Sequence, residues 1–162
     1  MLHFGSKPPF TLERFIQLCK GLLSEEDARI LLSCVQENIL DFKTEQQTIN
    51  KWRNFETALR NELASIRASR KKIDPVKYLH QDGFTEPYIS HLALNTYRNP
   101  SVLESERTLD MERWRFLDEL SLGHYFDLDF LIVYTFKLLI LERWDKISAA
   151  DKKQLLGELL RS

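Results

Sequence analysis

Cysteine and glycine are scarce in this chain, and each scarcity excludes a class of protein. The 162 residues include only Cys19 and Cys34, too few for a disulfide framework or a structural zinc site. Only five glycines occur, and they form no glycine-rich phosphate-binding loop. Two isolated thiols are typical of a reducing compartment, so we expect a cytoplasmic protein.

An excess of charge and a long apolar run are missing as well. The 23 basic and 24 acidic residues balance, so no global field attracts nucleic acid or an anionic membrane. The longest apolar stretch, 130–141, contains Lys137 and is shorter than the ~20 residues of a transmembrane helix. The first nine residues lack the basic start and apolar core of a signal peptide. We therefore expect no transmembrane segment and interpret 130–141 as part of a core helix.

What the chain does contain is a regular series of helix-start signals. Side chains able to accept hydrogen bonds from a first helical turn recur along it, and no apolar alternation of period two predicts a sheet. We predict one all-α domain over residues 1–162, a bundle of seven to eight helices with a hinge at 72–85. The predicted caps are Thr11, Ser24, Thr44, Thr85, Asp127 and Ser148. The predicted helices span 12–20, 25–38, 45–71, 75–81, 86–97, 101–121, 127–145 and 149–160.

The predicted 45–71 helix has an apolar stripe and a basic one. The apolar stripe predicts a face toward the core and consists of Ile49, Trp52, Leu59, Leu63 and Ile66. Arg53, Arg60 and Arg67 share the basic stripe, which suits a contact with the acidic 101–121 segment. A basic patch of Arg67, Arg70, Lys71 and Lys72 follows, with Trp52 and Tyr78 as stacking candidates. This patch is a candidate for nucleic-acid or anionic-surface binding, although the balanced charge and the absence of a helix-turn-helix signature argue against nucleic acid.

A polar cluster comes directly before the apolar segment, and it consists of Glu119, His124, Asp127 and Asp129. Gly123 can end one helix and Asp127 can cap the next, which is a purely structural interpretation. The same side chains could form an acid/base pair or hold a divalent metal ion. No paired Glu-x-x-His units or His-Glu-x-x-His run completes a known metal motif. We therefore favour the structural interpretation and assign no catalytic residue, metal or cofactor.

Four stretches of the sequence resemble a known family. They are FGSKPPF at 4–10, WRNFETALRNEL at 52–63, FLDEL at 116–120 followed by GHYFDLD at 123–129, and LERW at 141–144. The chain resembles a bacterial family of unknown function whose members accompany the subunits of V-type (vacuolar/archaeal-type) ATPases. The resemblance implies a non-catalytic cytoplasmic component or assembly factor of a proton- or sodium-translocating ATPase.

In this role the protein would act like the helical adaptor that joins the central stalk to the proteolipid ring in such ATPases, or would contact the peripheral stalk at the cytoplasmic membrane face. Candidate contact residues are Arg53, Glu56, Arg60, Glu119, His124, Asp127 and Asp129. The alternative for the same residues is an internal ion-pair network, which we favour because charged groups close to a core need partners. An enzyme centred on Glu119, His124, Asp127 and Asp129 remains the second functional hypothesis.

Overall fold

The chain is mainly helical in the part that its computed structural model describes, which is residues 2–35, 44–79 and 87–159, with side chains described up to residue 151. Within these ranges there is no strand, and six α-helices and one 3-10 helix are present, which confirms the all-α prediction. The elements are α1 (Leu12–Lys20), α2 (Glu25–Ser33), α3 (Gln47–Lys71), η1 (Pro75–Tyr78), α4 (Pro87–Arg98), α5 (Val102–Leu120) and α6 (Leu128–Leu159). None of the described helices is long and apolar enough to cross a membrane.

Three of the predicted helix caps are confirmed. The backbone amides of Arg14 and Asp27 donate to the hydroxyls of Thr11 and Ser24, over 3.2 and 3.1 Å. Asp127 Oδ1 accepts from the amide of Phe130 over 2.9 Å and so begins α6. These local signals can be identified from the sequence because donor and acceptor lie only three residues apart.

Two predicted caps are wrong, and the caps at Gln46 and Ser101 were missed. Gln46 caps α3, with its Oε1 accepting from the amide of Ile49 at 2.8 Å, whereas Thr44 accepts from the amide of Gln46. Ser148 begins no helix: the predicted helices 127–145 and 149–160 are one continuous α6. No glycine or proline separates them, and alanines follow Ser148, so helix propensity outweighs the weak cap signal. Ser101, which accepts from the amide of Glu104, caps α5 and was also missed. Thr85 lies outside the described residues.

The residue contacts group the chain into two units, Met1–Gln36 with Leu117–Ser162, and Glu37–Phe116. The single domain over 1–162 therefore stays a prediction. The hinge expected at 72–85 falls inside the second unit, where Lys72, in the left-handed conformation (φ 55°), caps the end of α3 and η1 follows. The last part of that hinge, 80–86, lies outside the described residues.

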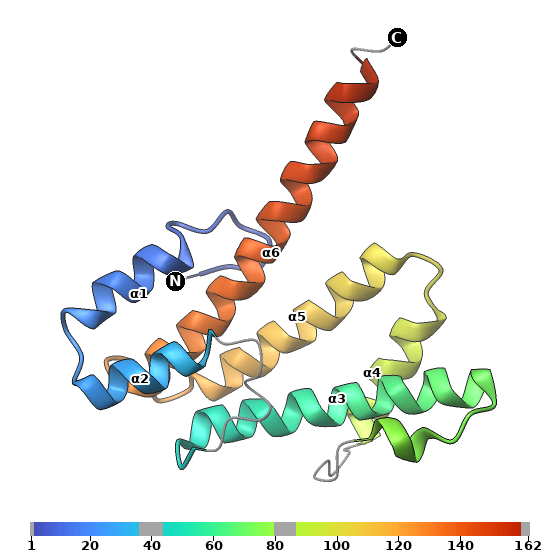
Figure 1. The fold of residues 1–162 in the computed structure, drawn as a ribbon, viewed down its shortest axis with the longest axis horizontal. Coiled ribbons are helices and arrows are strands. Elements are labelled where there is room, and N and C mark those ends of the chain that lie inside the picture. Colours follow the sequence, from blue (N-terminus) through green and yellow to red (C-terminus); the bar gives the residue numbers. More distant parts are fainter. Residues whose placement is uncertain (1, 36–43, 80–86, 160–162) are drawn as a thin grey trace. The chain divides into compact units, whose positions relative to one another are not determined.

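The first unit is built from α1, α2 and α6, and both short helices contact α6 (Figure 1). Phe15 of α1 packs against Tyr134 of α6 with ring centroids 4.9 Å apart. The amide of Leu12 donates to Glu142 Oε1 over 2.6 Å. A carboxylate from α6 thus accepts a hydrogen bond from a first-turn amide of α1 that has no partner within its own helix. Burial raises the pKa of Cys34 to about 12, which makes this thiol a packing group.

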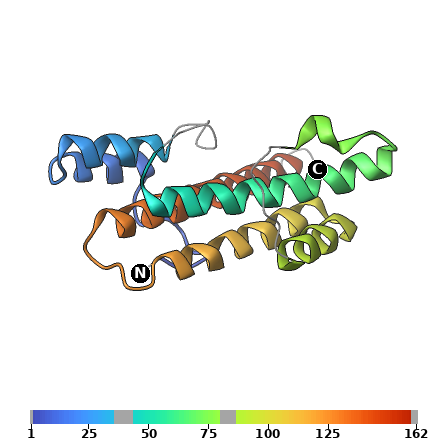
Figure 2. The same cartoon turned by 90° about the horizontal axis from the view of Figure 1, so that it is seen from below.

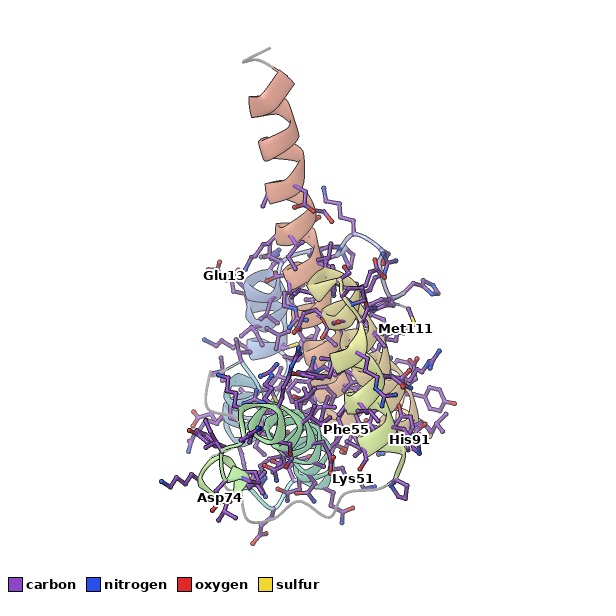
Figure 3. All side chains as sticks on the ribbon, turned by 90° about the vertical axis from the view of Figure 1, so that its right-hand side faces the viewer. Glu13, Lys51, Phe55, Asp74, His91 and Met111 are labelled. Carbon is purple, nitrogen blue, oxygen red and sulfur yellow. The ribbon has the colours of Figure 1, made fainter. Side chains whose placement is uncertain are left out.

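The second unit is organised around α3, which contacts α4 and η1 (Figures 1 and 2). Ile49, Trp52 and Leu59 are buried, as the apolar stripe predicts. Phe55 stacks on Phe116 with centroids 4.4 Å apart, and Figure 3 labels Phe55 together with the exposed Lys51 of the same helix. Leu63 and Ile66, expected in the same stripe, are only half-buried, so burial weakens toward the C-terminal half of α3.

Candidate functional site

The α5–α6 corner, residues 121–127, is shaped by its own backbone chemistry. The amide of Ser121 donates to the carbonyl oxygens of Leu117 and Asp118, over 3.1 and 3.2 Å, and closes the last turn of α5. Gly123 follows with φ 84°, a left-handed conformation in which a Cβ atom is unfavourable. Asp127 then caps α6. Both the glycine and the cap predicted for this corner are therefore confirmed.

Three of the four polar residues predicted at this corner come together. His124 Nδ1 lies 2.6 Å from Asp127 Oδ2 and 4.0 Å from Asp129 Oδ2. One donor atom from each of these residues fits within 4.8 Å of the other two, which is close enough to surround one metal ion. The three side chains are partly solvent-accessible, with exposed fractions of 36%, 45% and 26%. We call His124, Asp127 and Asp129 the corner triad.

The hydrogen bond from His124 lowers the pKa of Asp127, and the amide of Phe130 contributes in the same direction. Both donors stabilise the ionised carboxylate. Asp127 therefore has two structural duties, capping α6 and orienting the imidazole of His124. This arrangement fits the structural interpretation of the corner and leaves His124 Nδ1 engaged with a carboxylate.

Glu119 does not belong to the group of potential metal ligands that the corner triad forms. It is exposed on α5, before the left-handed turn at Gly123, whereas the triad follows that turn. The four-residue site expected from the sequence is therefore a three-residue site in the structure. Proximity in sequence misled the prediction, because the left-handed turn at Gly123 lies between Glu119 and His124.

Apolar side chains at the same corner were overlooked in the sequence. Leu122, Tyr125 and Phe126 are exposed by 76%, 71% and 105%. We call these three residues the apolar tip. A signal was present, because three large apolar residues occur in a loop between a helix-ending glycine region and a helix cap, where no periodic face buries them.

Asp118, just before the corner, pairs with the lysine inside the apolar segment. Lys137 Nζ lies 2.5 Å from Asp118 Oδ1, and the two side chains are 8% and 57% exposed. The partner of this buried ammonium group thus remains in contact with water. The pair explains how a charged residue is accommodated in the most apolar part of α6.

The second unit contains a separate ion-pair network at Glu56. Arg113 Nε lies 2.5 Å from Glu56 Oε1, and Arg113 Nη1 lies 3.0 Å from Asp110 Oδ1. Glu56 and Asp110 are 5% and 1% exposed. Burial by itself would lower the pKa of Arg113, but the two carboxylates outweigh it and raise the pKa, which keeps the guanidinium charged.

This network was predicted in part. Glu56 was expected in an internal network, and Arg60 approaches it at 3.8 Å while remaining 58% exposed. Arg53 is half-buried on the same helix. Its partners Arg113 and Asp110 were missed, and this ion pair between α3 and α5 has its acid on α3 and its base on α5. That polarity is opposite to the one expected from the basic stripe.

The predicted basic patch is exposed at all four positions, Arg67, Arg70, Lys71 and Lys72. Arg70 Nη1 donates to the hydroxyl of Tyr97 over 3.1 Å and lies 5.7 Å from the centre of its ring. Trp52 is buried at 6% exposure and cannot offer its ring to a base, which corrects the stacking role proposed for it. Tyr78, at 58% exposure, is the accessible aromatic residue of the predicted pair.

Comparison with known proteins adds one finding. Residues 87–161 match the model of a family described as "Protein of unknown function (DUF2764)". The matched part contains the corner and all of α6. Neither the curated proteins nor the solved structures include a match to the chain.

Proposed function

We propose that the protein is a non-catalytic accessory or assembly factor of a V-type ATPase, which pumps protons or sodium ions. The observation that carries the proposal is the resemblance of four stretches of the sequence to proteins that accompany such ATPases. The match at 87–161 covers two of those stretches, the corner at 116–129 and the end at 141–144. An adaptor at the central stalk, the proteolipid ring or the peripheral stalk needs a helical body with accessible contact surfaces.

The ionisable groups of the interior support this role over catalysis. Glu56, Asp110 and Arg113 are engaged with one another, and Lys137 is engaged with Asp118. A general acid or base must gain and lose a proton near the working pH, whereas an ion pair favours the charged form of both partners. The buried charges therefore serve to hold helices together, which suits a scaffold.

Affinity purification of the tagged full-length protein from its own host, in mild detergent and at low salt, tests the proposal. We expect recovery of stalk or ring components of the ATPase, and recovery of this protein when a stalk component carries the tag instead. A tagged helical protein of similar size serves as the control. If neither tag recovers the other partner while the bait is folded, the proposal is wrong.

A second candidate function is supported by the corner triad, whose donor atoms could bind a divalent metal ion and provide acid/base chemistry. Nitrogen and oxygen ligands about 2.0–2.2 Å from an ion lie roughly 3–3.5 Å from each other. The 2.6 and 4.0 Å separations in the triad lie on either side of that range, so small side-chain rotations would suffice. An ion would replace the hydrogen bond between His124 and Asp127.

Titration calorimetry with zinc and manganese chlorides tests this candidate. We expect one equivalent to bind to the natural protein and binding to be lost in Asp129→Asn, which keeps the cap at Asp127. Asp145→Asn, at an exposed position later on α6, is the matched control and should bind normally. Equal heats for all three proteins would reject the metal site.

A further inference from the structure

The three large apolar side chains of the apolar tip are mostly uncovered by the rest of the protein. Phe126 is fully exposed, and Leu122 and Tyr125 are exposed by 76% and 71%, all within five residues of one loop. Single exposed apolar residues are ordinary on protein surfaces, but a contiguous group marks a contact site. A few residues supply most of the binding energy at protein interfaces, and tyrosine is among the types enriched at those positions. The apolar tip therefore has the composition of an interface anchor.

The loop that presents this tip is held by several local hydrogen bonds. His124 Nδ1 forms a hydrogen bond with Asp127 Oδ2, which joins the residues just before and just after Tyr125 and Phe126. Asp127 Oδ1 accepts a hydrogen bond from the amide of Phe130. On the other side, the amide of His124 donates to the carbonyl oxygen of Ser121 over 3.1 Å. A loop already held in one conformation loses little entropy when it binds. The corner triad thus has a positioning role for the aromatic side chains.

The charges around the tip specify the chemistry of its partner. Residues 117–130 contain no lysine or arginine, and their four carboxylates are Asp118, Glu119, Asp127 and Asp129. Glu119 is exposed, and Asp127 and Asp129 are partly so. Because these carboxylates flank the apolar side chains along the chain, with Asp118 already paired to Lys137, a complementary partner has an apolar pocket rimmed by cations.

We propose that the apolar tip of Leu122, Tyr125 and Phe126 docks into an apolar pocket rimmed by lysine or arginine on a partner protein. A membrane surface fits less well, because anchors that enter the lipid interface usually carry basic residues that attract anionic headgroups. The carboxylates that flank the tip would be repelled by anionic headgroups. This inference concerns the contact surface and does not depend on which complex the partner belongs to.

Site-specific photocrosslinking of the full-length protein in its host tests the proposal. Benzoylphenylalanine replaces Phe126 in one strain and Leu22 in a control strain, and mass spectrometry identifies the crosslinked peptides. Leu22 is 87% exposed in the same unit, between α1 and α2, and so controls for exposure alone. We expect a defined peptide of another protein at position 126, with apolar residues flanked by lysine or arginine, and none at position 22.

The identified protein is then titrated with purified variants. Phe126→Ser should weaken binding by at least about tenfold, the effect of losing one interface anchor. Leu22→Ser should leave binding unchanged. Glu119→Lys should weaken binding at low salt, and this loss should become smaller as the salt concentration is raised, since only a charge is altered. Circular dichroism should show equal folding for all variants, because each altered side chain is exposed.

Crosslinks from position 126 to lipid, to a second copy of this chain, or equally from positions 126 and 22 would overturn the proposal. Equal affinities for Phe126→Ser and the natural protein would also overturn it. The test separates this inference from the ATPase role. A crosslinked partner outside the ATPase would support the tip without supporting that role. Recovery of ATPase components by the natural protein, with crosslinks from position 126 only to lipid, would support that role and overturn the tip.

Discussion

Arg113 Nε and Glu56 Oε1 lie 2.5 Å apart, although 57 residues separate them in the chain. Glu56 Oε2 also accepts from Arg113 Nη2 at 3.2 Å, so the guanidinium binds the carboxylate through two parallel hydrogen bonds. A bidentate pair of this kind fixes the relative positions of the two side chains as well as satisfying both charges. It connects α3 to α5 inside the second unit.

Removing one member of this pair is expected to destabilise the protein strongly. Arg113→Ala leaves the buried carboxylates of Glu56 and Asp110 without their main cation, and breaking a buried pair costs about 3–5 kcal/mol. Arg60→Ala, at a position 58% exposed, should cost less than about 1 kcal/mol. Urea unfolding followed by circular dichroism measures both values. Equal losses for the two variants would contradict the central role of Arg113.

The contact between Asp118 and Lys137 predicts an asymmetric response. Asp118→Ala leaves the ammonium of Lys137 buried beside fewer acceptors and should cost about 1–3 kcal/mol. Lys137→Met removes the buried charge, and water can then solvate the half-exposed carboxylate, so the cost should be near zero or the variant more stable. Thermal and urea unfolding of the two variants measure this difference. A larger loss for Lys137→Met would reverse our interpretation.

Gly123→Ala is expected to destabilise the corner, because φ is 84° at this position. A side chain in a left-handed conformation costs about 1–2 kcal/mol, although no atom lies within 4 Å of the added Cβ. Gly21→Ala is the matched control, since its φ is −80° and its Cβ would meet one carbonyl oxygen at an ordinary 3.8 Å. That change should be neutral or slightly stabilising. Equal unfolding midpoints for both variants would argue against a left-handed Gly123.

The hydrogen bond between His124 and Asp127 predicts a specific dependence on pH. Because the pKa of Asp127 is lowered in the folded protein, its contribution to stability is present above the unfolded value of about 3.9. That contribution disappears as the pH falls through the folded pKa. His124→Ala should raise the pKa of Asp127 toward the ordinary value, which carbon-13 NMR titration of the carboxyl group measures. An unchanged pKa in this variant would show that the bond is absent in solution.

The local sequence determined the helices, because their signals act over three or four residues. The caps at Thr11, Ser24 and Asp127 need only a side-chain oxygen and an amide three positions later, and both are visible in the sequence. The apolar stripe of α3 likewise reports its buried face. Where two local signals competed, as at Ser148, the prediction was wrong because the cap signal was weaker than helix propensity.

Only the tertiary structure decided which charges meet and which side chains remain exposed. No fixed sequence spacing predicts the contact between Glu56 and Arg113. The contact depends on how two distant segments pack, and such packing does not require a particular number of residues between them. Of the four residues predicted at the corner, Glu119 does not join the other three, because a left-handed glycine lies between it and His124. The position of Phe126 in a loop was a sequence signal, but only the structure decided its full exposure, since burial depends on the area that other segments cover and not on the residue's own hydrophobicity.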